Sequence, residues 1–144
     1  MPSLAQLLLA EKALLDETFG AGSYQLVETH EHACSVRTAI AEVSLAYDWR
    51  DQWVASDIKP LAVPERLQEM HSLETWLGFL DRRLPIRRKS GLDRRQVTDE
   101  LLLIQVVAKE ILADPERRRD AANFCRGYNE AYNDFYSGRW DTQG

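Results

Sequence analysis

The residues in this sequence whose types and spacing could bind a metal ion are two histidines and a cysteine at alternate positions. On an extended segment His30, His32 and Cys34 would project from one side, and imidazole nitrogens and thiolate sulfurs are ligands of tetrahedral zinc. A structural zinc site needs a fourth ligand, and the remaining histidine, His71, lies on the flank of a predicted helix. We therefore predict a polar turn with two solvated histidines and a buried thiol, without metal or cofactor. A zinc site is the alternative.

The sequence motifs that would identify an enzyme are missing. The chain has no GxSxG elbow, no phosphate-binding P-loop, no GxGxxG and no HExxH. Its neighbouring carboxylates, Asp48 with Asp51 and Asp99 with Glu100, have nothing beside them in the sequence that would raise the pKa of one member. We therefore expect a protein without catalytic activity.

Two tryptophans, an arginine and two carboxylates are concentrated in YDWRDQW, residues 47–53. Tryptophan and arginine dominate binding hot spots, because they bury a large area at little cost in entropy and carry a polar group. We predict that a partner protein contacts Trp49, Arg50, Asp51 and Trp53. In the alternative, Trp53 faces the core, Trp49 shields the edge of a sheet, and Arg50 pairs with an aspartate.

Charge is distributed unevenly along the chain. The net charge is −5, yet residues 81–95 hold seven basic and two acidic residues, which leaves −10 for the remainder. Arg87, Arg88 and Lys89 at the centre of this basic connector could contact phosphates or an acidic partner. Nucleic-acid modules also carry stacking aromatic residues, which this connector lacks, and the acidic body would repel a nucleic acid. Arginines that are solvated or paired with acidic helices are therefore favoured.

A predicted hairpin at residues 41–61 would position these residues. Apolar and polar side chains alternate before and after its turn, which is typical of antiparallel strands with one dry face. The apolar positions are Val43, Leu45, Tyr47, Val54 and Ile58. Segments 23–28 and 33–38 show strand patterns as well, so the sheet should have three to four strands.

Helical patterns surround this sheet. Ser3 and Gln6 have the spacing of a capping box in front of a helix over residues 4–19. Three further helices are predicted after the hairpin: one from Pro64 to Leu84, one capped by Asp93, and one that starts at Asp114-Pro115 and ends near Gly138. The fold class is therefore α+β, with an N-terminal helix, a small antiparallel sheet and three helices packed on one face.

Size and composition fit one globular domain over residues 1–144, with a short tail at 139–144. The apolar run at residues 7–10 is too short to span a bilayer and has no basic residues before it. Cys34 and Cys125 lack CxxC spacing and are expected to be free thiols in a reducing compartment. We therefore expect a cytoplasmic protein without a membrane segment.

This layout, together with YDWRD at residues 47–51 and the acidic body, resembles small uncharacterised α+β proteins of bacteria. These include immunity-type proteins, which neutralise a toxin encoded beside them. The resemblance implies a non-enzymatic protein-binding function and assigns no site residue. An acidic surface with rigid aromatic anchors also suits electrostatically steered capture of a basic toxin.

Two other functions fit the sequence. The first is a homodimeric structural or adaptor protein, paired through the surfaces of Trp76 and Phe79 or of Tyr132 and Tyr136. The second is a nucleic-acid-associated protein that uses residues 82–95, whose binding would weaken steeply with salt. Of the three functions, the sequence favours binding of another protein.

Overall fold

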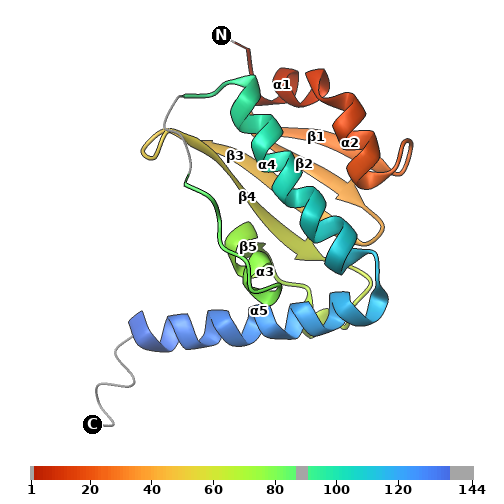
Figure 1. Cartoon of the computed structure of the whole chain (residues 1–144), viewed down its shortest axis with the longest axis vertical. Coiled ribbons are helices and arrows are strands. Elements are labelled where there is room, and N and C mark those ends of the chain that lie inside the picture. The colour runs from red at the N-terminus through yellow and green to blue at the C-terminus, as the bar shows by residue number, and fades with distance from the viewer. Residues whose placement is uncertain (1, 87–90, 137–144) are drawn as a thin grey trace.

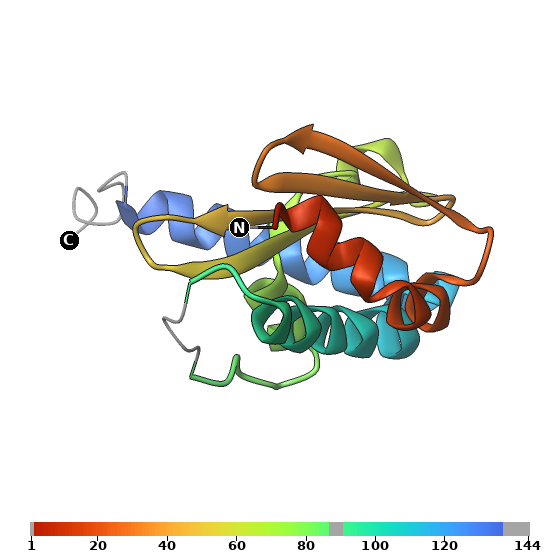
Figure 2. The same cartoon turned by 90° about the horizontal axis from the view of Figure 1, so that it is seen from above.

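A five-stranded antiparallel sheet is the centre of the structure, with helices against one of its faces (Figures 1 and 2). The computed structural model describes residues 2–86 and 91–136, except for the side chains of 132–136. The strands lie in chain order and are β1 (Tyr24–His30), β2 (Ala33–Thr38), β3 (Ala41–Asp48), β4 (Trp53–Pro60) and β5 (His71–Ser72). The helices are α1 (Leu4–Ala10), α2 (Lys12–Phe19), α3 (Leu73–Phe79), α4 (Arg94–Val107) and α5 (Pro115–Tyr136). The α+β class is thus as predicted, with one strand more than expected.

The β3–β4 hairpin confirms the alternation seen in the sequence. Val43 pairs with Ile58 and Tyr47 with Val54, and all four side chains are buried on the face that the helices cover. The same face continues onto β2, where Cys34 and Val36 are fully buried in the same hydrophobic core. The alternation of apolar and polar residues therefore determines both the register of the hairpin and the face of the sheet that is buried.

The first predicted helix is divided into two. Its capping box is present, since Gln6 N donates to Ser3 Oγ at 3.2 Å and Ser3 N donates to Gln6 Oε1 at 2.8 Å. The helix ends at Ala10, and Glu11 between α1 and α2 has non-helical angles of φ −102° and ψ 30°. Glu11 instead accepts a hydrogen bond from Arg94 of α4, which ties this break to the neighbouring helix.

The prediction of one helix from Pro64 to Leu84 is wrong. A short 3₁₀ turn at Glu65–Leu67 is followed by extended chain and by the edge strand β5, and the helix proper begins only at Leu73. Ser72 determines this start, because its hydroxyl accepts a hydrogen bond from Thr75 N at 3.3 Å as the N-cap of α3. His71 therefore lies on a strand and not on a helix.

The last two helices begin where the sequence predicts. Asp93 caps α4, and Asp114 caps α5 directly before Pro115, with carboxylate oxygens accepting from Gln96 N and Glu116 N at 2.9 Å each. A π-helical segment, Ala108–Leu112, continues α4. Helix α5 packs on α3 and on the 3₁₀ turn and then runs past them (Figure 1). Within the described part of the chain, no helix has both the length and the apolar character needed to cross a membrane.

Candidate functional site

The turn between β3 and β4 is held by its own first aspartate. Asp48 Oδ1 accepts hydrogen bonds from Arg50 N at 2.9 Å and Asp51 N at 3.2 Å, and Asp48 O accepts from Gln52 N at 2.7 Å. Gln52 has a φ of 58°, the left-handed conformation that reverses the chain toward β4. Aspartate favours such turns because its side chain can bond backbone N–H groups two or three residues ahead. The backbone of the tip is therefore ordered from within.

A glutamine of α4 fixes the hairpin to the rest of the fold. Gln96 Oε1 accepts from Val54 N at 2.9 Å, and Gln96 Nε2 donates to Gln52 O at 3.1 Å. The Gln96 side chain is nearly buried, so these bonds form where little water competes. The side-chain amide therefore bonds one backbone N–H and one backbone C=O at the start of β4, as the backbone of a neighbouring strand would.

Trp49 lies at the outer end of this turn and is both exposed and held. Its accessible fraction is 61%. Its ring centroid is 4.8 Å from that of Tyr47 and 5.0 Å from that of His32, with the rings inclined at 86° and 80°. Edge-to-face contacts of this kind contribute about 0.5–1.5 kcal/mol each beyond the area that they bury. One side of the indole is thus fixed while the other faces solvent.

His32 reaches the tip because β2 lies beside β3. It belongs to the turn between β1 and β2, and His32 O accepts a hydrogen bond from Tyr47 N at 2.9 Å. Its side chain is only 15% exposed, so the prediction that both histidines are solvated holds for His30 alone. Sequence spacing does not assign His32 to the tip, since only the pairing of two strands brings it there.

The geometry assumed for the zinc alternative is wrong. The chain reverses at residues 31–32, so His30, His32 and Cys34 do not follow one another along an extended segment. Cys34 points into the core, and burial raises the pKa of its thiol to about 11. Among the side chains that the structure describes, those of residues 2–86 and 91–131, no three from His, Cys, Asp or Glu are grouped as metal ligands would be.

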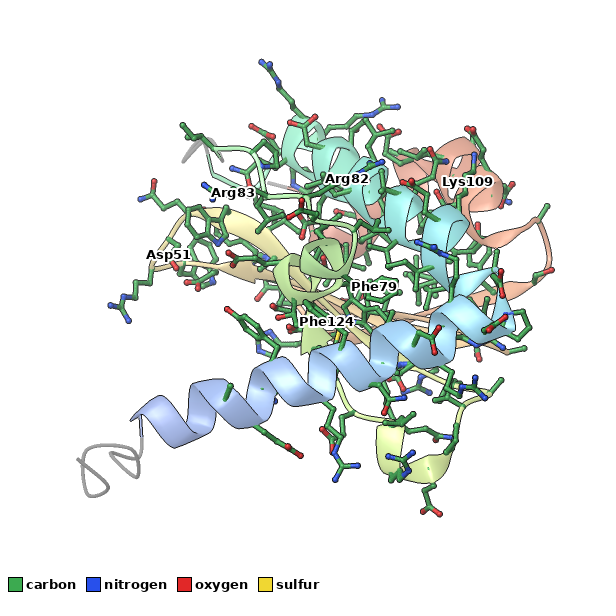
Figure 3. All side chains as sticks on the ribbon, turned by 60° about the horizontal axis from the view of Figure 1, so that its bottom comes forward. Asp51, Phe79, Arg82, Arg83, Lys109 and Phe124 are labelled. Carbon is green, nitrogen blue, oxygen red and sulfur yellow. The ribbon has the colours of Figure 1, made fainter. Side chains whose placement is uncertain are left out.

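The remaining predicted partner contacts lie at different depths. Arg50 is exposed next to Trp49, whereas Asp51 is half-buried in the same turn, at the end of the hairpin (Figure 3). Trp53 is half-buried and lines a separate cavity of about 510 Å³ between the start of β4, α4 and residues 85–86. The exposed end of the tip therefore consists of Trp49 and Arg50.

The residues that line this cavity include a buried carboxylate, Glu100. Glu100 of α4 is 3% exposed, and its Oε2 accepts a hydrogen bond of 2.6 Å from the hydroxyl of Ser56 on β4. The pair is absent from the predicted sites, although the sequence contains a signal for it. Ser56 is the polar member of the inward series between Val54 and Ile58, and Glu100 falls on the core side of α4 beside Val97. Because buried polar groups are almost always hydrogen-bonded, two polar residues at inward positions predict a hydrogen bond between them.

The two thiols are not suited to nucleophilic chemistry. Burial raises the pKa of Cys125 to about 12, and Cys34 is likewise raised, so both thiols are protonated at neutral pH. Each side chain is fully buried in the core. A cysteine nucleophile needs a thiolate that a substrate can reach, and neither residue offers one.

Only part of the basic connector can be placed. Arg87, Arg88 and Lys89 lie outside the described residues. Arg82 pairs with Glu110 of the π-helical segment at 3.0 Å, and Arg94 pairs with Glu11 in the break between α1 and α2, so these two arginines neutralise acidic side chains of other segments. For both of them, the prediction of pairing within the fold is confirmed.

The surfaces suggested for a homodimer are only partly available. Trp76 is fully buried and its Nε1 donates to Ile58 O at 3.1 Å, so the prediction that it forms a surface is wrong. Phe79 is partly exposed, and its ring lies 5.8 Å from that of Phe124. The side chains of Tyr132 and Tyr136 lie outside the described part.

In comparisons with known proteins, the chain matches no protein-family model, no curated protein and no solved structure.

Proposed function

We propose that this chain is a non-enzymatic protein-binding protein whose contact surface is centred on Trp49. The observation that carries the proposal is the state of that side chain, which is 61% exposed yet packed edge-to-face on Tyr47 and His32. A fixed aromatic ring loses little conformational entropy when a partner covers it, so most of the area that it buries becomes affinity. Solvent-exposed Arg50 beside it supplies hydrogen-bond donors for the rim of the contact.

The more specific form of the proposal is an immunity-type inhibitor of a cognate bacterial toxin. It is supported by the resemblance of the sequence layout and by a net charge of −5 with a pI near 5.2. An acidic protein attracts a basic one before contact and so increases the rate of association. The partner would then be a cationic protein whose activity ends when the tip is bound.

The test compares two exposed apolar side chains. Leu9 of α1 is 60% exposed and therefore matches Trp49 in accessibility, but it lies on a helix away from the hairpin. A photoreactive amino acid placed at Arg50 should cross-link the partner in cells that produce the protein. We expect Trp49→Ala to abolish the adduct and to raise the Kd of the purified partner by about thirtyfold or more, the effect of losing about 2 kcal/mol.

Leu9→Ala should leave both the adduct and the affinity unchanged. Thermal denaturation of the two variants should stay within a few degrees of the parent, because both side chains are mostly exposed. Equal effects of the two substitutions on binding, or unfolding by Trp49→Ala alone, would remove the tip from the proposal. If the cross-linked partner keeps its own activity when this protein is bound, the immunity-type form is refuted and the protein-binding function remains.

A further inference from the structure

The second half of helix α5 extends away from the rest of the molecule (Figures 1 and 3). The helix has 22 residues, which corresponds to about 33 Å at 1.5 Å per residue. Ala121, Ala122 and Cys125 in its first half are fully buried, whereas every residue from 127 to 131 is exposed. Helical segments of about ten residues are marginal in water, because packing supplies most of their stability. A surface that covers this half would therefore stabilise it.

An apolar strip runs along one side of this helix. Phe124 and Tyr128 are 40% and 53% exposed, and Ala131 is exposed as well. The spacings of four and three residues place the three side chains on one side of the helix. The strip continues onto the body of the protein, because Phe79 of α3 packs on Phe124 with ring centroids 5.8 Å apart (Figure 3). We call these four residues the α5 strip.

We propose that the α5 strip is an interface between two copies of this chain, in which the α5 helices pair antiparallel and cross at Gly127-Tyr128. In this register Phe124 of each copy faces Ala131 of the other, and Tyr128 faces Gly127. Large residues then meet small ones in both layers, as close packing of two helices requires. A two-fold axis at the crossing makes the contact self-complementary, which any isologous dimer needs. A Cβ at Gly127 would meet open space, so a second helix has room to approach there.

The local charge favours a second copy over a strongly charged partner. Between residues 121 and 131 the sequence has one basic residue, Arg126, and one acidic residue, Glu130. Their side chains already pair at 3.2 Å. The whole chain carries −5, so two copies repel each other except where they meet through neutral surfaces. The α5 side of the strip, residues 124–131, is such a surface, whereas Phe79 has the guanidinium of Arg117 over its ring at 5.5 Å. A site for a cationic or anionic protein would carry the opposite charge along the helix itself.

The experiment is a measurement of mass in solution by sedimentation, over about 1 to 200 μM protein. The parent should pass from 16.6 kDa to twice that mass as its concentration rises. Tyr128→Glu should raise the dimer Kd at least tenfold, because it places a charge at the crossing point. Tyr128→Phe should keep the dimer. Asn129→Glu is the matched control, since Asn129 is also exposed but, two residues from both Gly127 and Ala131, lies on the opposite side of the same helix.

Ala131→Glu provides a second disruptive variant at an exposed position, in case Tyr128→Glu alters the helix. Circular dichroism should show parental helicity for every variant when all are compared at monomeric concentrations. A mass of 16.6 kDa at all concentrations would overturn the proposal, as would a dimer that both glutamate variants leave intact. The dimer does not use the hairpin tip, so Trp49→Ala should leave the mass in solution unchanged.

Discussion

Trp49 is held in place without being buried, and three neighbouring groups explain how. Tyr47 lies on the strand before Trp49, and His32 lies in the turn between β1 and β2. Asp48, between Tyr47 and Trp49, holds the backbone of the tip through its hydrogen bond from Arg50 N. Each contact uses the side of the indole that faces the protein, which leaves the opposite side accessible. Removal of one support should therefore weaken binding through disorder of Trp49 and with little effect on the fold.

His32→Ala tests this dependence. We expect a several-fold loss of partner affinity, smaller than that caused by Trp49→Ala, because one edge-to-face contact worth about 0.5–1.5 kcal/mol disappears while the indole remains. Titration calorimetry measures the affinity, and thermal denaturation checks the fold. His30→Ala is the control, since His30 is exposed at the other side of the same turn. If the two alanine variants bind equally well, His32 does not support the contact surface.

The pair formed by Ser56 and Glu100 makes a second prediction. Ser56→Ala should lower the free energy of unfolding by about 1–3 kcal/mol, because the buried carboxylate loses a hydrogen-bond donor. Ser44→Ala, on the other face of the sheet at the neighbouring strand, should cost less than about 0.5 kcal/mol. Urea denaturation measures both values. Equal costs would show that the Ser56 hydroxyl contributes nothing to the stability of the buried acid.

At the level of elements, capping residues and alternation allowed most of the fold to be predicted. Asp93 and Asp114 begin α4 and α5 as the sequence indicated, and the period of two placed the dry face of the β3–β4 hairpin. These signals are local, so the sequence contains them completely. The same patterns placed Trp49 and Arg50 at an exposed tip.

The features that were missed depend on contacts between distant segments. Strand β5 has two residues, too few for any period, and it exists because Ile58 pairs with His71. The apolar spacing around it continued a helical pattern although Ser72 begins a new helix there. The contact of His32 with Trp49 likewise arises from the pairing of β2 with β3. No local pattern encodes such pairings.

Strand β5 also makes folding sensitive to pH. The His71 side chain is 1% exposed, and burial lowers its pKa, with Glu69 and Asp57 opposing this shift. The unfolded chain therefore binds a proton at His71 more readily than the folded one. Stability from this group is complete above the ordinary pKa of about 6.5 and is lost as the pH falls through the lower pKa of the folded state.

We expect the free energy of unfolding to fall as the pH is lowered below about 6.5, and this fall to be smaller in His71→Gln. Denaturation at several pH values measures the slope. His30→Gln, an exposed histidine on β1, should keep the slope of the parent. A parental slope in His71→Gln would assign the pH dependence to other groups.

At the scale of the whole molecule, the hairpin tip and the free half of α5 extend toward the same side in all three views (Figures 1–3). The tip would contact a partner and the α5 strip a second copy, so the two proposals use different surfaces. Their substitutions should therefore act independently, and additive effects are expected for sites without shared neighbours.

The net charge of −5 makes a prediction about association with the proposed basic partner. An increase in ionic strength from about 50 to 500 mM should slow association by about tenfold or more and change dissociation little, because salt screens attraction before contact. Stopped-flow fluorescence measures both rate constants. An association rate that does not respond to salt would contradict electrostatic capture and the immunity-type form of the proposal.

The most direct test of the central claim is oxidative footprinting of the protein in two states. One is the free protein, and the other is the protein saturated with the purified partner that cross-linking identified. Trp49 is mostly accessible in the free chain and should become strongly protected from hydroxyl radicals in the complex, while the equally exposed Leu9 should react as before. Oxidation of Trp49 that is unchanged in the saturated complex would contradict the claim that this tip is the binding surface.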